Sequence, residues 1–205
     1  MILQFRVSMI SDLNIFLSKT MTITLTYQHQ FPYSDRMKMV MIVAMDEDCN
    51  IGSSGELPWR LKSDMIRFKS LTEGDGFNSV IMGRKTWDSL PADFTPLPDR
   101  TNIVMSRDTN WYADGAVTAL YVGRAIEIAL ADGCDECWVI GGSQIYEMFL
   151  ERVEEIHVTK VHVGGSGNVS FPVWNKINWS EEVIEHVPED AHNEHATTYS
   201  VWTKN

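Results

Sequence analysis

The chain has 205 residues, of which 44% are hydrophobic and 22% charged, so it can bury one sizeable core. A formal charge of −11 argues against a nucleic-acid-binding protein and against a peripheral protein of anionic membranes. The apolar runs fall far short of the roughly 20 residues of a membrane helix, and three cysteines are too few for a disulfide framework. We expect a cytoplasmic protein that is monomeric and binds neither nucleic acid nor membrane.

Residues 1–36 differ in composition from the rest of the chain. They mix apolar and hydroxyl residues with few charges, and Asp12 and Lys19 interrupt the only candidate for a secretory signal. A transit peptide is an alternative, although acidic Asp12 disfavours it. We interpret the segment as an extension, disordered or upstream of a natural start at Met37 or Met39, and we expect the folded domain to span 37–205.

From Met37 onward, predicted strands and helices alternate. Short apolar runs predict strands at 39–45, 79–82, 102–105, 136–140 and 155–163. Helical spacing or a glycine stop predicts helices at 63–72, after Gly83, at 123–132 and at 144–150. The alternating segments 179–187 and 197–203 flank a polar turn and predict a terminal hairpin. This order predicts an α/β fold with a largely parallel sheet and an antiparallel edge.

Ligands of open α/β sheets bind at the carboxyl ends of the strands, so the loops there are the candidate sites. The loop after the first strand carries Gly52 and Pro58-Trp59, and Asp64 follows in the first turn of the next helix. An acid at that position can simply complement the helix N-terminus. Asp64 shares its helical face with Phe68 and Leu71, however, and burial would make it a functional carboxylate with a perturbed pKa.

Three later strands end in residues suited to a phosphate. Met82 is followed by Gly83-Arg84-Lys85-Thr86, and Met105 is followed by Ser106-Arg107. The strand ending at Ile140 runs into Gly141-Gly142, where the missing side chains allow close approach to the backbone. Each piece alone fits a plain turn, but two basic clusters in an acidic protein suggest a polyanionic cofactor.

Taken together, these residues resemble the pattern of dihydrofolate reductase over nearly all of the chain from Met39 to Thr203. The resemblance rests on Ile51-Gly52, Leu57-Pro58-Trp59, Asp64, Phe68, Met82 to Trp87, Leu97 to Arg100, Ser106-Arg107, Ile140 to Tyr146 and Phe171-Pro172. It implies an eight-stranded sheet flanked by helices. It also implies reduction of 7,8-dihydrofolate to 5,6,7,8-tetrahydrofolate with NADPH, by hydride addition to C6 and protonation of N5, as part of one-carbon metabolism.

The resemblance also implies roles for individual residues. Asp64 would be the ionisable side chain against the pterin, Thr159 would hydrogen-bond that carboxylate, Trp59 would hold a nearby water, and Leu57 would line the same site. The implied substrate-binding residues are Ile42, Ala44, Met65, Phe68, Lys69, Leu90, Arg100, Ile140 and Tyr146. The implied NADPH-binding residues are Ala44, Ile51, Gly52, Arg84, Lys85, Thr86, Ser106, Arg107, Gly141, Gly142, Ser143, Gln144, Ile145 and Tyr146.

Other motifs are interpreted as structural. Cys134 and Cys137 have C-x-x-C spacing, but they follow a helix and enter a strand, so we expect buried thiols and no metal site. His192 and His195 fall in the terminal turn, where solvation is the simpler interpretation. Methionines at strand and helix positions, Met65 among them, are expected to fill the core.

Two alternative functions remain at this point. Another reductase with the same fold, such as a riboflavin-pathway pyrimidine reductase, would share the Gly141-Gly142 site but not the set formed by Trp59, Asp64 and Arg100. A non-catalytic nucleotide-binding module could also have kept the fold. NADPH oxidation on addition of dihydrofolate separates the three.

Overall fold

The computed structural model describes residues 37–53 and 58–205; the predicted extension 1–36 and Leu57 lie outside the described residues. The strands are β1 (Lys38–Met45), β2 (Asn50–Gly52), β3 (Ser79–Gly83), β4 (Thr101–Met105), β5 (Ala116–Ala119), β6 (Glu136–Gly141), β7 (Glu155–Val161), β8 (Val169–Ser170), β9 (Trp179–Val187) and β10 (Thr197–Lys204). The α-helices are α1 (Lys62–Glu73), α2 (Arg84–Asp88), α3 (Val122–Asp132) and α4 (Ser143–Phe149), and 3-10 turns occur at Ala92–Phe94 and Lys176–Asn178.

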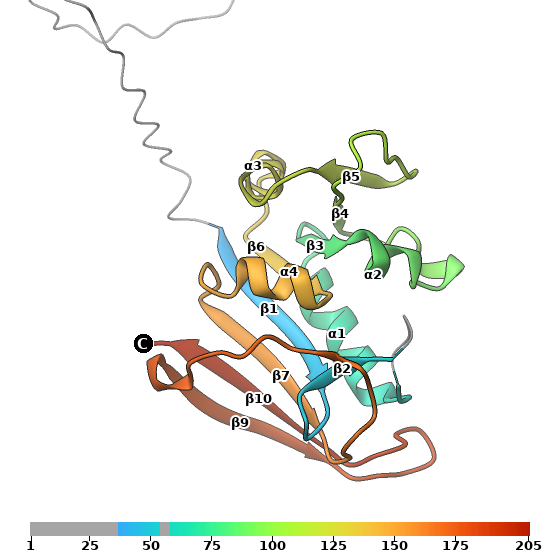
Figure 1. The fold of residues 1–205 in the computed structure, drawn as a ribbon, viewed down its shortest axis with the longest axis vertical. Coiled ribbons are helices and arrows are strands. Elements are labelled where there is room, and N and C mark those ends of the chain that lie inside the picture. The colour runs from blue at the N-terminus through green and yellow to red at the C-terminus, as the bar shows by residue number, and fades with distance from the viewer. Residues whose placement is uncertain (1–36, 54–57) are drawn as a thin grey trace, which may run out of the picture. The chain divides into compact units, whose positions relative to one another are not determined.

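Eight of these strands form one sheet in the order β5-β4-β3-β6-β1-β7-β10-β9 (Figure 1). The six strands from β5 to β7 run parallel to one another, whereas β10 is antiparallel to both β7 and β9. The predicted α/β class with a mostly parallel sheet and a terminal antiparallel pair is therefore confirmed. The parallel strands bring their carboxyl ends to one edge, where the loops of the candidate site begin.

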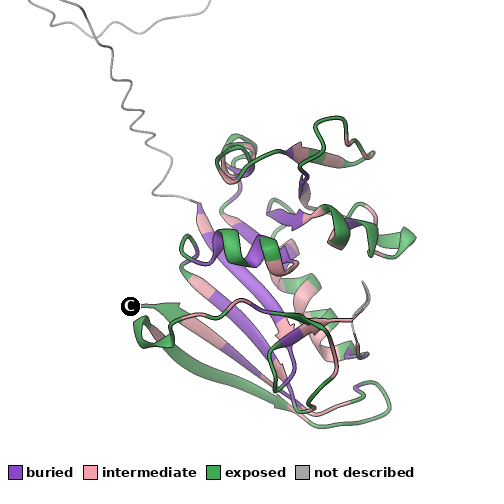
Figure 2. Ribbon diagram, viewed as in Figure 1, coloured by how far each residue is buried: buried purple, intermediate pink, exposed green. Residues whose placement is uncertain are grey.

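The sheet is buried on both faces, as the alternation along β1 shows. Met39, Met41 and Val43 belong to a core cluster that includes side chains of α3 and α4. Val40 and Ile42 point to the other face and belong to a second cluster, against which residues of α1 and α2 pack. Figure 2 shows the buried residues concentrated in these central strands, while β9 at the sheet edge is largely exposed. Burial on both faces explains why the central strands are continuous apolar runs.

Two strand pairings were not predicted. Strand β5 has four residues and lies at the open edge of the sheet beside β4. Strands β2 and β8 pair with each other in a separate two-stranded sheet. Strands this short carry too few residues for a period-2 pattern, so the hydrophobic pattern could not indicate them.

The burial of the two neighbouring thiols agrees with the structural role expected from the sequence. Cys134 and Cys137 are both free and buried, and burial raises the pKa of each thiol. Within residues 37–53 and 58–205, no group of three or more His, Cys, Asp or Glu side chains could hold a metal ion. No helix among the same residues is long and apolar enough to cross a membrane.

Candidate active site

The carboxyl group of Asp64 lies in the first turn of α1, with its side chain only 17% exposed. It accepts a hydrogen bond of 2.6 Å from the hydroxyl of Thr159 on β7. Burial raises the pKa of Asp64 above its ordinary value, although the Thr159 hydrogen bond and the Arg67 cation oppose that shift. A buried carboxyl group with a perturbed pKa and a defined hydrogen-bond partner is a candidate functional group.

The register of the sheet explains why Thr159 meets Asp64. Ala44 of β1 pairs with Thr159, Thr159 pairs with Tyr199 of β10, and Tyr199 pairs with Glu185 of β9. Directly paired residues point to the same face of a sheet, so these four side chains form a row across it. Helix α1 lies along this row, and Asp64 contacts it at Thr159.

Sequence reasoning missed Arg67, which lies one turn after Asp64 on α1. Its Nη1 atom is 3.5 Å from Oδ1 of Asp64 and 3.5 Å from the hydroxyl of Thr159. Its Nη2 atom donates to Oε2 of Glu185 at 2.5 Å, and its guanidinium lies 4.2 Å from the centre of the Tyr199 ring. The i,i+3 spacing of an acid and an arginine was the available signal, but the partners on β9 and β10 depend on strand register.

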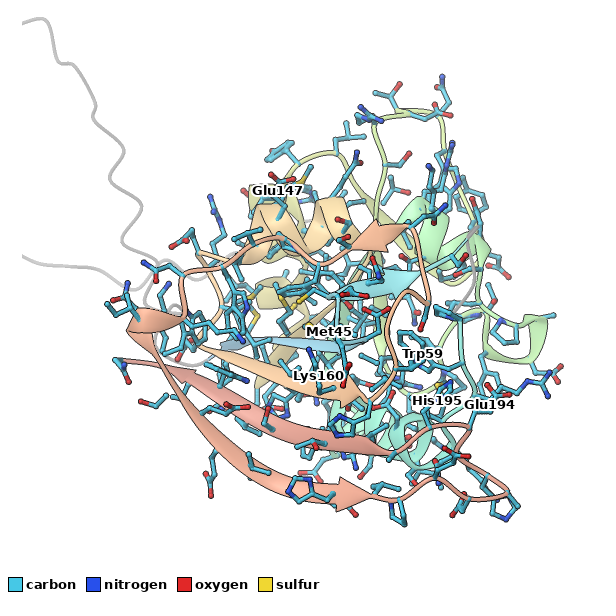
Figure 3. All side chains as sticks on the ribbon, turned by 60° about the horizontal axis from the view of Figure 1, so that its bottom comes forward. Met45, Trp59, Glu147, Lys160, Glu194 and His195 are labelled. Carbon is cyan, nitrogen blue, oxygen red and sulfur yellow. The ribbon has the colours of Figure 1, made fainter. Side chains whose placement is uncertain are left out.

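Beside Asp64 lies a cavity of about 530 Å³. Its lining includes Asp64, Met65 and Trp59, together with Arg60, Leu61, Lys62, Ala191, His192 and Glu194. The turn between β9 and β10 is joined to residues 60–63 by four hydrogen bonds. The Arg60 amide donates to the Glu194 carboxylate and the Glu194 amide to the Arg60 carbonyl, while the Lys62 amide donates to the His192 carbonyl and the Ser63 amide to the Asn193 side chain. Figure 3 shows Trp59 close to Glu194 and His195. The predicted turn thus forms one wall of the cavity.

The predicted apolar lining residues gather on the α1 side of the sheet. Ile42 and Ile140 are buried in the second core cluster, and Phe68 and Leu90 pack against that cluster. The side chain of Met65 is 51% exposed, so the expectation that it fills the core was wrong. Met65 lies on the cavity side of α1, at a position where a ligand could cover it.

Two predicted cations lie toward the other end of α1. The guanidinium of Arg100 donates a 2.7 Å hydrogen bond from Nη1 to Thr72 and a 2.8 Å hydrogen bond from Nε to the Pro98 carbonyl. Lys69 is exposed and pairs with Glu73 at 3.8 Å. Arg100 is therefore fixed in orientation, whereas Lys69 is held only by a weak surface pair.

The predicted cofactor residues lie at the carboxyl ends of three adjacent strands, β4, β3 and β6. Ser106 and Arg107 follow β4, α2 begins at Arg84 directly after β3, and α4 begins at Ser143 after β6. The predicted set at these three ends is Arg84, Lys85, Thr86, Ser106, Arg107, Gly141, Gly142, Ser143, Gln144, Ile145 and Tyr146. Neighbouring parallel strands end at the same edge of the sheet, so these segments, far apart in the sequence, meet along one edge.

Gly141 cannot be replaced by a larger residue without a shift. Its φ is +108°, and a Cβ atom there would lie 2.9 Å from the Tyr146 ring. The Tyr146 hydroxyl in turn donates a 2.8 Å hydrogen bond to the Ile42 carbonyl, and burial raises the pKa of this phenol. The glycine thus lets Tyr146 fill the space between α4 and β1 beneath the candidate cofactor surface.

The segment with Ile51 and Gly52 is fixed by contacts to the β7–β8 connection. The amide of Asn168 donates to the Gly52 carbonyl at 3.1 Å. A Cβ atom on Gly167 would lie 2.4 Å from that same oxygen, so a glycine is required for this close approach. The two strands β2 and β8 extend the contact.

Comparison with known proteins identifies the family. A family model described as dihydrofolate reductase matches residues 38–204. The chain is 38% identical over 145 residues to a dihydrofolate reductase of Neisseria meningitidis, which covers 71% of this chain and 85% of the relative. It is 34% identical over 168 residues to one from Staphylococcus haemolyticus (82% and 96% covered) and 41% identical over 138 residues to one from Mycobacterium tuberculosis (66% and 80%). With the predicted fold confirmed and these matches spanning the sheet and the site, the chain belongs to the dihydrofolate reductase family of enzymes.

Proposed function

We propose that this protein reduces 7,8-dihydrofolate to 5,6,7,8-tetrahydrofolate with NADPH, using Asp64 as the ionisable group against the pterin. The observation that carries the proposal is the mostly buried Asp64 carboxyl group, hydrogen-bonded by Thr159 beside a cavity. Family membership supports the reaction class, and the residues that contact Asp64 support its role.

The carboxylate would accept hydrogen bonds from the pterin N3 and its exocyclic amine. A negative charge there favours the protonated pterin, whose C6 is the better hydride acceptor, and a water molecule would bring the proton to N5. The Thr159 hydroxyl keeps one carboxylate oxygen in a fixed orientation. Trp59, buried in the segment before α1, would hold the water at the cavity wall. Leu57, outside the described residues, is proposed to line the same site.

Apolar side chains would exclude bulk water from the reacting atoms. Ile42, Ala44, Phe68, Leu90 and Ile140 lie in or against two core clusters beside α1. A dry environment strengthens the interaction between the carboxylate and the pterin. Met65, Lys69, Arg100 and Tyr146 complete the proposed substrate set, with Arg100 binding the α-carboxylate of the folate glutamate in the bidentate geometry that lysine lacks.

The residues at the ends of β4, β3 and β6 fit a phosphate-bearing dinucleotide. Lys85 and Arg107 are exposed, and neither forms an ion pair with the described residues. Arg107 and Ser106 would hold the adenosine 2′-phosphate together with Arg84, while Lys85, Thr86 and the Gly141 to Tyr146 segment would hold the pyrophosphate. Ala44, Ile51 and Gly52 would border the nicotinamide. NADPH, when bound, supplies the hydride.

Replacement of Asp64 by Asn tests the proposal. The amide keeps the size and one acceptor for Thr159 but loses the charge, so dihydrofolate-dependent NADPH oxidation at neutral pH should fall by about 100-fold or more. Arg124→Met on α3, which removes an exposed arginine paired with Glu127, is the control and should keep full activity. An unchanged rate in Asp64→Asn would dismiss the role of this carboxyl group.

A further inference from the structure

An arginine inside a proposed acid site is the feature that the proposed mechanism does not use. The side chain of Arg67 is 12% exposed and contacts four groups from four elements: Asp64 on α1, Thr159 on β7, Tyr199 on β10 and Glu185 on β9. The guanidinium is therefore held on several sides, and its orientation is determined by the sheet. Such a fixed cation next to a mostly buried carboxyl group acts on it through little intervening water.

We propose that Arg67 is a positioning residue that stabilises the charged form of Asp64, and that Glu185 sets the strength of this effect by sharing the same guanidinium. This inference rests on the proposed function of Asp64. Arg67 contacts Asp64 but is not among the residues that line the cavity, so its effect on turnover passes through Asp64. Asp64 and Glu185 bind different nitrogens of one guanidinium, Nη1 and Nη2, so the two carboxylates share one positive charge.

The geometry gives the two partners unequal surroundings. Asp64 is 17% exposed, whereas the side chain of Glu185 is 53% exposed and well solvated. The Tyr199 ring presents its face to the guanidinium, with its centre 4.2 Å from the central carbon, which adds a cation–π attraction to the two carboxylates. Removing Arg67 would leave Asp64 with the Thr159 hydroxyl as its remaining partner among the described side chains.

Other charged and titratable groups face the same region. Tyr146 from α4 and Tyr199 from β10 are near enough to interact with the Asp64 charge, and burial raises the pKa of both phenols. Around the cavity lie Arg60, Lys62, His192 and Glu194. Burial raises the pKa of Asp64, and Arg67 is the cation that opposes this. The cavity groups are common to every variant below and cancel in the comparison.

The direction in which Arg67 and Glu185 shift the alkaline pKa of turnover is the same whether Asp64 or the bound pterin holds the proton. Turnover should fall at alkaline pH as one proton is lost from the coupled pair of Asp64 and the bound pterin, and the apparent pKa belongs to that pair. A nearby cation disfavours protonation of either member, and a nearby anion favours it. Loss of Arg67 must therefore raise the apparent pKa, and loss of the Glu185 charge must lower it.

The test compares pH profiles of kcat in four variants. In Arg67→Met the alkaline limit should move up by about one pH unit, the lower end of the effect of a charge within about 4–6 Å. In Glu185→Gln it should move down by a few tenths of a unit, because the lost charge is more distant and solvated. Arg67→Lys keeps the charge and should restore most of the wild-type value. Arg124→Met, which removes a surface arginine from a similar i,i+3 pair, should leave the profile unchanged.

A second readout does not require catalysis. Carbon NMR titration of aspartate-labelled protein, with the Asp64 signal assigned by its loss in Asp64→Asn, should show the same order of carboxyl pKa values in the free variants. Equal pKa values in Arg67→Met and the wild type, or a Glu185→Gln value that is raised or unchanged, overturn the inference. If Asp64→Asn keeps full activity, the proposed function fails instead, and the titration still decides the role of Arg67. Should Arg67→Met not fold, the exposed Glu185→Gln site decides the sign.

Discussion

At the scale of single residues, the buried Asp64 carboxyl group affects the stability of the fold as well as the proposed reaction. The raised pKa of Asp64 means that the folded protein holds this proton more tightly than the unfolded chain does. Such a group stabilises the fold below the unfolded-state pKa of about 3.9, and this stabilisation is lost as pH rises through the folded-state pKa. At neutral pH the buried charge therefore lowers the free energy of unfolding.

Asp64→Asn should accordingly be more stable than the wild type at pH 7. Each kcal/mol regained raises Tm by about 2–4 °C in a chain of this size, so the Tm of the variant at pH 7 should lie above that of the wild type. Thermal unfolding at pH 7 and at pH 3.5 checks this, because the gain should shrink at the lower pH. A variant that is less stable at pH 7 would contradict the pKa direction of Asp64.

Arg107 should decide which nicotinamide cofactor is preferred. The proposed 2′-phosphate contact is absent in NADH, so Arg107→Met should raise KM for NADPH by about tenfold or more, the loss of a charge-assisted bond, and leave KM for NADH nearly unchanged. Initial rates with both cofactors measure this, with Arg124→Met as the charge-matched control. Equal losses with the two cofactors would count against the phosphate contact.

The burial of Asp64 could be predicted from the sequence, but its surroundings could not. The helical face that Asp64 shares with Phe68 indicated that the acid faces inward. The contacts of Arg67 to Glu185 and Tyr199 depend on how β9 and β10 pair, and the pairing is irregular just beyond Tyr199. Such a register cannot be derived from hydrophobic alternation alone.

At the scale of the elements, the loop after β1 is held by one carboxylate. Asp46 is fully buried and accepts hydrogen bonds from the amides of Asp48, Asn50 and Ser166 and from the Asn50 side chain. Burial raises the pKa of Asp46, but these four bonds outweigh burial and hold the pKa below its ordinary value. One side chain therefore ties the turn before β2 to the segment before β8.

Asp46→Ala should loosen both segments together. Three backbone amides lose their acceptor, so we expect a loss of about 2–4 kcal/mol and a Tm lower by roughly 5–15 °C. The control is Asp48→Ala in the same turn, which removes a bond to the Gly165 amide at the exposed surface and should cost much less. The difference should persist down to about pH 3.9 and shrink in stronger acid, because Asp46 stabilises the fold only when charged. Equal Tm losses in the two variants would contradict the role of Asp46.

Element prediction succeeded where patterns were long and failed where strands were short. Helix α3 ends at Gly133 in the left-handed conformation, with φ of +79°, as its glycine stop predicted. Strand β5 is too short for its own signal and forms because the edge of β4 is available. Local sequence thus predicts elements that carry their own periodicity, and tertiary pairing creates the others.

At the scale of the whole molecule, the domain should fold without its first 36 residues. Met37 and Met39 are buried in the core, Lys38 pairs with Glu155 at 2.6 Å, and the family match begins at residue 38. A protein starting at Met37 keeps these contacts. We expect residues 37–205 to retain the Tm and kcat of the full chain, measured side by side. Loss of folding in the shorter protein would contradict the predicted boundary.

The sequence predicted the parallel sheet, but it did not predict the strand order. Strand β1 is the first of the sheet in the chain, yet it lies in the centre between β6 and β7. Every crossover from one parallel strand to the next allows several neighbours, and apolar strands buried on both faces carry no mark of their position. The resemblance to a known family implied eight strands, and the structure gives their order.

That strand order sets the distance between the two ends of the proposed site. Strand β4, which is followed by Ser106-Arg107, is separated from β7, which carries Thr159, by three intervening strands. With neighbouring strands about 4.8 Å apart, the two ends of the site lie roughly 19 Å from each other. A small nucleotide bound at the end of β4 would not reach the residues on β7. The proposed site therefore has the length for an elongated ligand, and the strand order rather than the side chains sets that length.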